Sequence, residues 1–299
     1  MTIHHTSSET MGQIYVPGVN LVLAVLTLYL VLTFKTSSAL AGAYGVAVAA
    51  TMVMTTVLTF FVARSSWRWP LWGSALLMGA FLLVDMAFLG ANATKIAHGG
   101  WFPLVVGGVV FTLMTTWRSG RDLLMERLEA RAFPLEMFIA DVAKHPPVRV
   151  SGVSIFMTGS SSGTPVALLH NVKNNKVLHD TVVLLSVRTE EIPIVPAGER
   201  ISVELLEQGF RRVTARYGFM DTPDIKEVLD LCRQHGHDWP VNKTTFFLGR
   251  TTLIATDKPG LAKWRKRLFS LMGRNAERAT TYFNIPPGRV VELGMQVEL

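Results

Sequence analysis

Asp85 is the residue whose setting in this sequence points most directly to chemistry. It lies about 14 residues into the apolar stretch 71–90, roughly 20 Å along a helix that rises 1.5 Å per residue. A carboxylate is costly inside hydrocarbon, and such groups commonly bind ions or relay protons. We expect a role for Asp85 in ion coupling; the alternative is a buried structural acid that is hydrogen-bonded or reaches the wet interface.

Tyr44 is the second candidate. It lies in a run of small residues in which alanine recurs at positions 39, 43 and 47, with Gly45 and Ala49 at the same spacing. Small residues four apart allow helix backbones to approach closely inside a membrane bundle. We therefore expect this helix to pack against several neighbours. The Tyr44 hydroxyl would offer an oxygen to a cation or hydrogen-bond within the bundle.

The elements that hold these two residues follow from an abrupt change in composition near residue 120. Only seven Asp, Glu, Lys or Arg residues occur in 1–120, and the other 44 occur in 121–299. Four stretches of the first part carry almost no charge: 16–34, 39–63, 71–90 and 101–117. A helix needs about 20 such residues to cross the hydrocarbon layer. We predict a transmembrane bundle of four helices in 1–120 and a water-facing domain in 121–299.

Arginine is concentrated on one side of these stretches: Arg64 and Arg68 between the second and third, and Arg118, Arg121, Arg127 and Arg131 after the fourth. The connections on the opposite side carry only Lys35 and Lys95. Positively charged connections remain in the cytoplasm. The C-terminal domain is therefore expected to be cytoplasmic.

The C-terminal domain has the pattern of a compact α+β fold whose strand order cannot be read. We predict a helix over 118–145, ended by Pro146 and Pro147, and a second helix over 225–235. Short runs typical of strands are 153–158, 166–169, 181–187, 201–206, 212–217, 245–248 and 290–297. The run GSSSGT at 159–164 lacks the ending of a phosphate-binding P-loop, so we expect a flexible surface loop there.

Segment 261–272 is amphipathic. Its apolar face carries Leu261, Trp264, Leu268, Leu271 and Met272, with basic residues elsewhere. Either a membrane-surface helix near anionic lipids or a helix whose apolar face enters the domain core fits this pattern.

Several functions find little support in the sequence. The net charge of +7 is explained by the cytoplasmic flanks of membrane helices, so no nucleic-acid partner is expected. The histidines match no zinc-binding spacing, and the lone Cys232 cannot form an internal disulfide. We expect no metal site, no cofactor and no enzymatic activity.

Several segments resemble one known family from the start of the chain to its end, in order: IHHTS at 3–7, GQIYVP at 12–17, SALAGAYGVAV at 38–48, GGWFPL at 99–104, PPVRV at 146–150, HNVKNNKVLH at 170–179 and IPPGRVVELG at 285–294. These segments are similar to the KUP/HAK/KT family of potassium transporters. The resemblance implies potassium uptake in symport with protons across the bacterial inner membrane. It also implies an inverted-repeat bundle of the APC/LeuT type.

The resemblance also sets expectations for size and partners. Family members have about twelve transmembrane helices, so the chain looks like a C-terminal portion, in which Tyr44 lies on the tenth helix beside the ion route. The alternative is a membrane-anchored regulatory or interaction protein, derived from a truncated transporter, that does not transport. The expected partners are membrane lipids, potassium and protons, with a homodimer and a cyclic-dinucleotide regulator as further options.

Overall fold

A computed structural model of the chain describes residues 3–130, 133–159, 163–275 and 279–299. It divides into two compact units, one of Gly18–Thr115 and one of Met1–Pro17 with Thr116–Leu299. Helix α4, Trp101–Glu129, contributes to both units.

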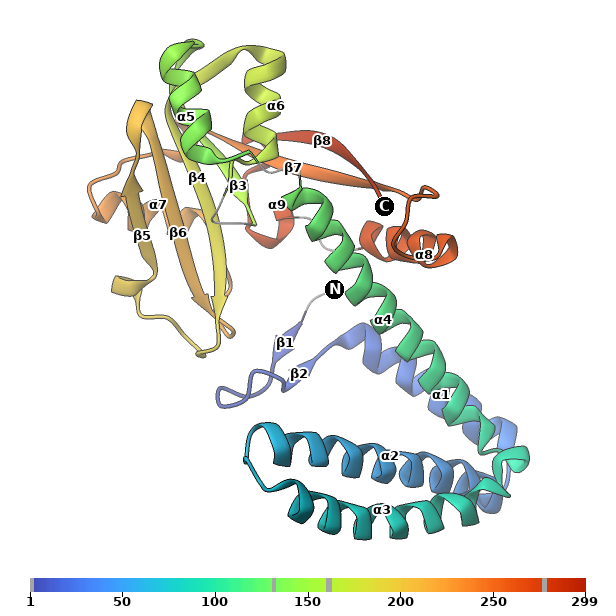
Figure 1. The fold of residues 1–299 in the computed structure, drawn as a ribbon. Coiled ribbons are helices and arrows are strands. Elements are labelled where there is room, and N and C mark those ends of the chain that lie inside the picture. Colours follow the sequence, from blue (N-terminus) through green and yellow to red (C-terminus); the bar gives the residue numbers. More distant parts are fainter. Residues whose placement is uncertain (1–2, 131–132, 160–162, 276–278) are drawn as a thin grey trace. The chain divides into compact units, whose positions relative to one another are not determined.

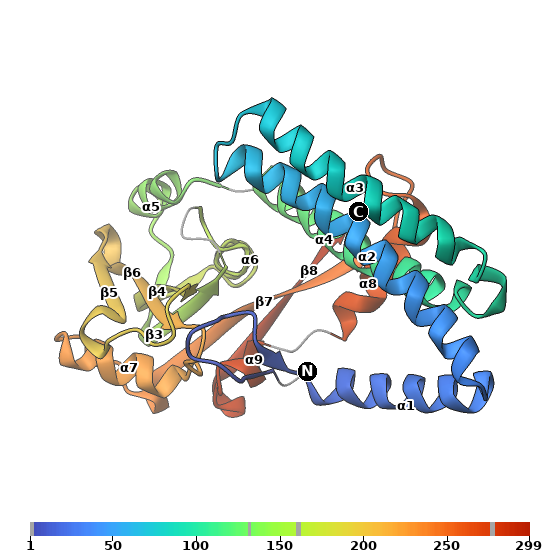
Figure 2. The ribbon, with the colours of Figure 1, turned by 90° about the horizontal axis from the view of Figure 1, so that it is seen from below.

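The unit of Gly18–Thr115 is helical. Helices α1 (Pro17–Phe34), α2 (Ser37–Ser65) and α3 (Leu71–Ala93) are long and apolar enough to cross a membrane. Helices α2 and α3 lie side by side in both views (Figure 1 and Figure 2). These helices confirm the prediction of a helical membrane region. The fourth predicted span, 101–117, is helical within α4, but α4 is not among these three helices.

The other unit contains a six-stranded sheet, drawn in Figure 1. Its strands are β3 (Val148–Thr158), β4 (Val177–Glu190), β5 (Ile201–Leu205), β6 (Phe210–Gly218), β7 (Thr244–Ile254) and β8 (Val290–Glu298). They are ordered β5-β6-β4-β3-β7-β8, and every neighbouring pair is parallel except the antiparallel pair β5–β6. The N-terminal hairpin of β1 (His4–His5) and β2 (Ile14–Tyr15) also belongs to this unit.

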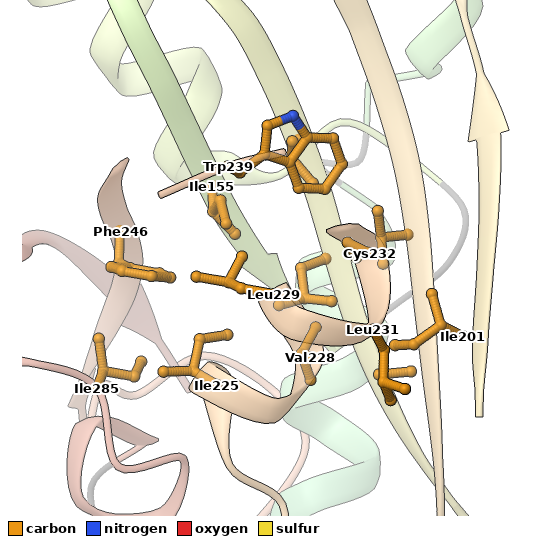
Figure 3. Close-up of a cluster of buried hydrophobic side chains, with 14 of the residues drawn as sticks. Ile155, Ile201, Ile225, Val228, Leu229, Leu231, Cys232, Trp239, Phe246 and Ile285 are labelled. Carbon is orange, nitrogen blue, oxygen red and sulfur yellow. The ribbon is translucent and has the colours of Figure 1, made fainter. Parts of the chain in front are cut away.

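Alternate residues of the central strands enter two separate cores, because side chains of a strand point to opposite faces of the sheet. One core packs helices α5 (Leu135–Lys144) and α6 (Val166–Asn175) on Phe156 and its neighbours. The other packs α7 (Ile225–Gln234) on Ile155 and Phe246, as Figure 3 shows.

Three details of the predicted C-terminal domain are wrong. Residues 166–169 form the first turn of α6 and not a strand; Ala167, Leu168 and Asn171 are its buried face, a helical spacing that a short apolar run conceals. The predicted helix over 118–145 is two helices, α4 and α5. The fold is α/β rather than α+β, because α6 and α7 each connect one strand of the sheet to the next and allow parallel pairing.

The other predicted strands and the helix over 225–235 are confirmed, with boundaries shifted by a few residues. Asp224 begins α7 as its N-cap, where its carboxylate accepts a hydrogen bond from the backbone N–H of Lys226 at 2.7 Å. Two further helices, α8 (Lys263–Arg274) and α9 (Ala279–Tyr282), lie between β7 and β8 in the sequence.

Candidate functional site

Helices α2 and α3 pack side by side as a hairpin, and small residues of α2 set their distance. Val46 and Ala49 are buried at 1% and 2% exposure. A Cβ on Gly45 would lie 2.5 Å from the side-chain oxygen of Asn92 on α3, so a larger residue there would force the Asn92 side chain to move. Helix α2 thus packs closely against α3, whereas its predicted packing against several neighbours stays a prediction. The side chain of Ala39 lies outside the described part of the chain.

Asp85 is buried between these two helices. Only 5% of its surface is exposed, and its Oδ2 atom accepts a hydrogen bond of 2.5 Å from the Thr56 hydroxyl on α2. No other side chain or backbone group of the described residues hydrogen-bonds to this carboxylate. One donor leaves a buried carboxylate with most of its hydrogen-bonding capacity unused.

A groove of about 460 Å³ runs along α2 beside this carboxylate. Its lining consists of Tyr44, Ala47, Val48, Thr51, Met52, Thr55, Thr56 and Asp85. Both residues singled out in the sequence therefore border the same groove. They do not meet, because Tyr44 precedes Thr56 by twelve positions, which is about 18 Å along a helix.

The Tyr44 side chain projects outward, with 72% of the residue exposed. Within the described chain its hydroxyl has no hydrogen-bond partner. A free phenol at the border of the groove is available as a donor or an oxygen ligand.

The threonines of α2 divide into two groups. Thr51, Thr55 and Thr59 donate to the carbonyl four residues earlier, at 2.9, 2.9 and 2.7 Å. Such bonds satisfy a hydroxyl within its own helix. Thr56 is one position off this row and faces α3, where it donates to Asp85. We did not assign this partner from the sequence, although the break in the four-residue spacing marks Thr56 as different.

The Asp85 carboxylate can exchange a proton, and the groove can hold a hydrated cation. The groove lacks the full set of oxygen ligands that a dehydrated cation needs. Potassium sites replace the hydration shell with several oxygens at once. The groove offers the Asp85 carboxylate and side-chain hydroxyls, while the carbonyls of α2 lie within a helix. Among the described residues no group of three or more His, Cys, Asp or Glu side chains could hold a metal ion.

The C-terminal unit holds a second polar cluster that sequence reasoning missed. Arg200 pairs with Glu227 and with Asp221, the latter at 3.2 Å. Asp221 also accepts from the backbone N–H groups of Gly218 and Val195 at 2.8 and 3.1 Å. Each of the three charged groups has at least one partner, so this cluster fixes the chain around β5 and β6 rather than awaiting a ligand.

Other predicted binding features have no assigned ligand. Residues 160–162 of the serine-rich run at 159–164 lie outside the described residues, so the loop there stays a prediction. His179 lies beside the Phe247 ring, and burial lowers the pKa of its imidazole. Cys232 is buried in the core of Figure 3, where burial raises the pKa of its thiol to about 11.

Comparison with known families accounts for most of the chain. The sequence model of the K+ potassium transporter integral membrane domain matches residues 1–122. The model of the K+ potassium transporter C-terminal domain matches residues 151–299. The two matches occur in chain order, on the two parts that differ in charge.

Curated relatives match the chain throughout. A probable potassium transport system protein Kup of Myxococcus xanthus is 57% identical over 299 residues, which are 100% of this chain and 46% of that protein. A probable Kup 2 protein of Chromobacterium violaceum is 51% identical over 302 residues, 100% of this chain and 48% of that protein. One from Chlorobium chlorochromatii is 45% identical over 299 residues, again 100% and 48%. The chain thus spans about half the length of the curated relatives it matches.

Proposed function

The chain belongs to the family of K+ potassium transporters, and from this premise we propose that it takes part in potassium uptake across the bacterial inner membrane, in symport with protons. Members of this family are transporters and not enzymes. The proposed mode is secondary active transport, in which the inward movement of protons drives the entry of the cation. The membrane helices would belong to an inverted-repeat bundle.

The observation that carries this proposal is the state of Asp85. It is a carboxylate at the depth of a membrane helix, held by one hydroxyl and bordering a groove. Protonation neutralises such a group, and deprotonation creates a negative charge that attracts a cation. Asp85 would therefore take up and release the coupled proton, while Thr56 keeps its carboxylate turned toward α2. Tyr44 would contact the ion farther along the groove.

The proposed topology places four helices across the membrane and the C-terminal unit in the cytoplasm. The apolar stretch 101–117 of α4 would form the fourth span, flanked by Trp101 and Trp117. Aromatic residues of this kind favour the two interfaces of a bilayer. Arg64 and Arg118 then lie on the same, cytoplasmic side, as the positive-inside bias requires.

Uptake measurements test the proposal in a bacterial strain that lacks its own potassium uptake systems. One strain expresses the 299-residue chain, and a second expresses a fusion in which the N-terminal part of the Myxococcus xanthus relative precedes it. Asp85→Asn should lower the initial rate of potassium uptake about tenfold or more in whichever of the two proteins transports, because the amide cannot carry the proton. Asp230→Asn, an exposed change on α7, is the matched control.

The outcomes separate the alternatives. Uptake that depends on Asp85 and on an inward proton gradient supports symport. Full, proton-dependent uptake by the Asp85→Asn variant, at equal membrane level, would contradict the role of this carboxylate. Absence of uptake by both the 299-residue chain and the fusion, with both proteins in the membrane, would favour a membrane-anchored protein that does not transport.

A further inference from the structure

Helix α8 carries an exposed face of mixed character. Trp264 and Leu271 are each 57% exposed, and Arg267 and Arg274 are exposed on the same side. Residues three, four and seven positions apart lie on one side of a helix, so these four form one surface. We name Trp264, Arg267, Leu271 and Arg274 the outer face of α8.

The apolar residues predicted to share one face of 261–272 are therefore divided. The buried side of α8 is formed by Phe269 and Lys266, each 1% exposed. Trp264 and Leu271 remain outside the core. Neither alternative drawn from the sequence is complete, since α8 packs on its own unit and still presents apolar residues outward.

Helix α8 is held against the final part of α4, beside which it is drawn in Figure 1. The Phe269 ring lies 5.4 Å from that of Trp117, measured between centroids. A Cβ on Gly120 would lie 2.4 Å from the Phe269 ring, so glycine permits this contact. Arg265 donates from Nε to the Thr116 hydroxyl at 3.0 Å. These contacts fix residues 265–269 of α8 beside residues 116–120 of α4.

The position of this contact along α4 gives the level of α8. Thr116 and Trp117 are the last residues of the uncharged stretch 101–117, and Arg118 follows at once. If this stretch crosses the bilayer, as proposed above, Trp117 lies where hydrocarbon meets headgroups. The first turn of α8, with Trp264 next to Arg265, then lies at the same level.

We propose that the outer face of α8 docks on the anionic lipid headgroups of the cytoplasmic leaflet. Trp264 and Leu271 would enter the interface, and Arg267 and Arg274 would bind lipid phosphates. A helix with apolar residues between arginines is suited to this boundary. The inference goes beyond transport, but it rests on the proposed span in α4.

Charge supports lipid as the occupant. In the described part of the chain neither Arg267 nor Arg274 has an ion-pair partner. By contrast, Lys263 pairs with Asp257 at 2.8 Å, and this contact lowers the pKa of Asp257, with a smaller effect from Arg267.

A groove of about 460 Å³ between α8 and β7 has room beside the two arginines. It is lined by Arg267, Ser270, Leu271 and Arg274, together with residues 252–254 of β7 and Ala255 after it. The Ser270 hydroxyl already donates to the Leu253 carbonyl at 3.3 Å. The two guanidinium groups at this groove match the phosphate of a headgroup, while Leu271 matches its acyl chain.

A spin label at Leu271→Cys in the full 299-residue chain tests this docking. The native Cys232 does not compete for the label, because it is 0% exposed and its thiol pKa is raised to about 11. The labelled chain is reconstituted in vesicles of phosphatidylcholine, with or without phosphatidylglycerol. We expect collisions with oxygen to exceed collisions with a water-soluble nickel complex when phosphatidylglycerol is present. Asp230→Cys, on α7, gives the reference value for water.

A charge variant tests the arginines. Arg267→Gln with Arg274→Gln should move the label at 271 toward the water reference in vesicles with phosphatidylglycerol. Arg233→Gln with Arg250→Gln, which removes two exposed arginines elsewhere in the unit, should leave it unchanged.

Two results would overturn the inference. The first is nickel accessibility at 271 equal to that of the reference in both kinds of vesicle. The second is spin–spin broadening at 271 that disappears on dilution with unlabelled chain, which would identify a second copy as the occupant. A label at Val109→Cys separates this failure from that of the proposed span. If 109 lies in hydrocarbon and 271 in water, only the docking is wrong; if both lie in water, the span is wrong.

Discussion

The two units of this chain hold buried charge in different ways. In the helical unit, Asp85 is 5% exposed and receives a hydrogen bond from Thr56 alone among the described residues. In the C-terminal unit, Lys266 is 1% exposed. Its ammonium donates to three backbone carbonyls, those of Thr256 at 3.1 Å, Leu299 at 2.8 Å and Lys258.

This difference separates a charge that stabilises the fold from one that is available for chemistry. An ammonium has three hydrogens, and Lys266 uses all of them, so it has no capacity left for a ligand. The carboxylate of Asp85 can accept several more hydrogen bonds and borders a groove. Burial alone does not distinguish these two residues. The number of satisfied hydrogen-bonding positions does.

Lys266→Met should lower stability more than any other substitution proposed for this chain. The substitution keeps much of the side-chain volume but leaves buried carbonyls without a donor. We expect it to lower the free energy of unfolding of the C-terminal unit by about 2–4 kcal/mol. Labelling of buried Cys232 in increasing urea reports this opening in the purified chain, because the thiol reacts when the core around it separates.

Lys173→Met, an exposed change on α6, is the matched control and should leave the labelling curve in place. An unchanged curve for Lys266→Met would show that the three carbonyls are satisfied in another way. The comparison with Asp85 would then lose its basis. Asp85→Asn should leave the same curve unchanged, because its effect is on uptake.

Local patterns predicted many of these elements. The uncharged stretches predicted α1, α2 and α3 within a few residues, and the run 225–235 predicted α7. Asp85 stands out because a carboxylate is rare in such stretches, and Tyr44 because it lies among the small residues of α2. Their common groove could not be foreseen, since it depends on which face of α2 meets α3.

Apart from the first turn of α6 and the break between α4 and α5, the features that sequence reasoning missed depend on contacts between distant segments. Lys266 reads as one of several basic residues in 263–267, and only the arrival of 256–258 and Leu299 around it reveals a buried site. The parallel strand order likewise depends on where α6 and α7 return the chain. Periodicity within one segment contains no information about either.

Gly120→Ala should have a smaller effect than Lys266→Met, and it tests how rigidly the C-terminal unit is built around its buried charge. The new Cβ would lie 2.4 Å from the Phe269 ring, which is itself buried, so the ring must move. Displacing a packed ring costs about 1–3 kcal/mol. We expect the free energy of unfolding to fall by that amount, so that Cys232 becomes labelled at a lower urea concentration.

Gly107→Ala in the same helix is the control, because nothing described lies within 4 Å of a Cβ there. If Gly120→Ala and Gly107→Ala give the same labelling curve, the Phe269 ring can move away from α4 at little cost in stability. The inference that α8 is fixed at the level of Thr116 would then fail.

Tyr217→Phe should have the smallest effect on stability. It extends the comparison of buried charges from Asp85 and Lys266 to Glu227. Glu227 accepts from the Tyr217 hydroxyl at 3.2 Å and also pairs with Arg200, so it is held by two donors where Asp85 has one. Losing one of the two donors to Glu227 should lower the free energy of unfolding by about 0.5–1.5 kcal/mol. Urea unfolding at pH 9, followed by circular dichroism, measures this difference.

The same variant makes a prediction about pH. Burial raises the pKa of Tyr217 well above 10.0, and the negative charge of Glu227 raises it further. Above pH 10 the unfolded chain releases this proton while the folded chain keeps it, so this contribution to stability is full below pH 10 and is lost as the pH rises. At pH 11 the wild-type chain should lose about 1 kcal/mol that Tyr217→Phe does not lose. The difference in free energy of unfolding between the wild-type chain and Tyr217→Phe should therefore narrow or reverse from pH 9 to pH 11. A constant difference would mean that the hydroxyl ionises freely and that Glu227 is held by Arg200 alone.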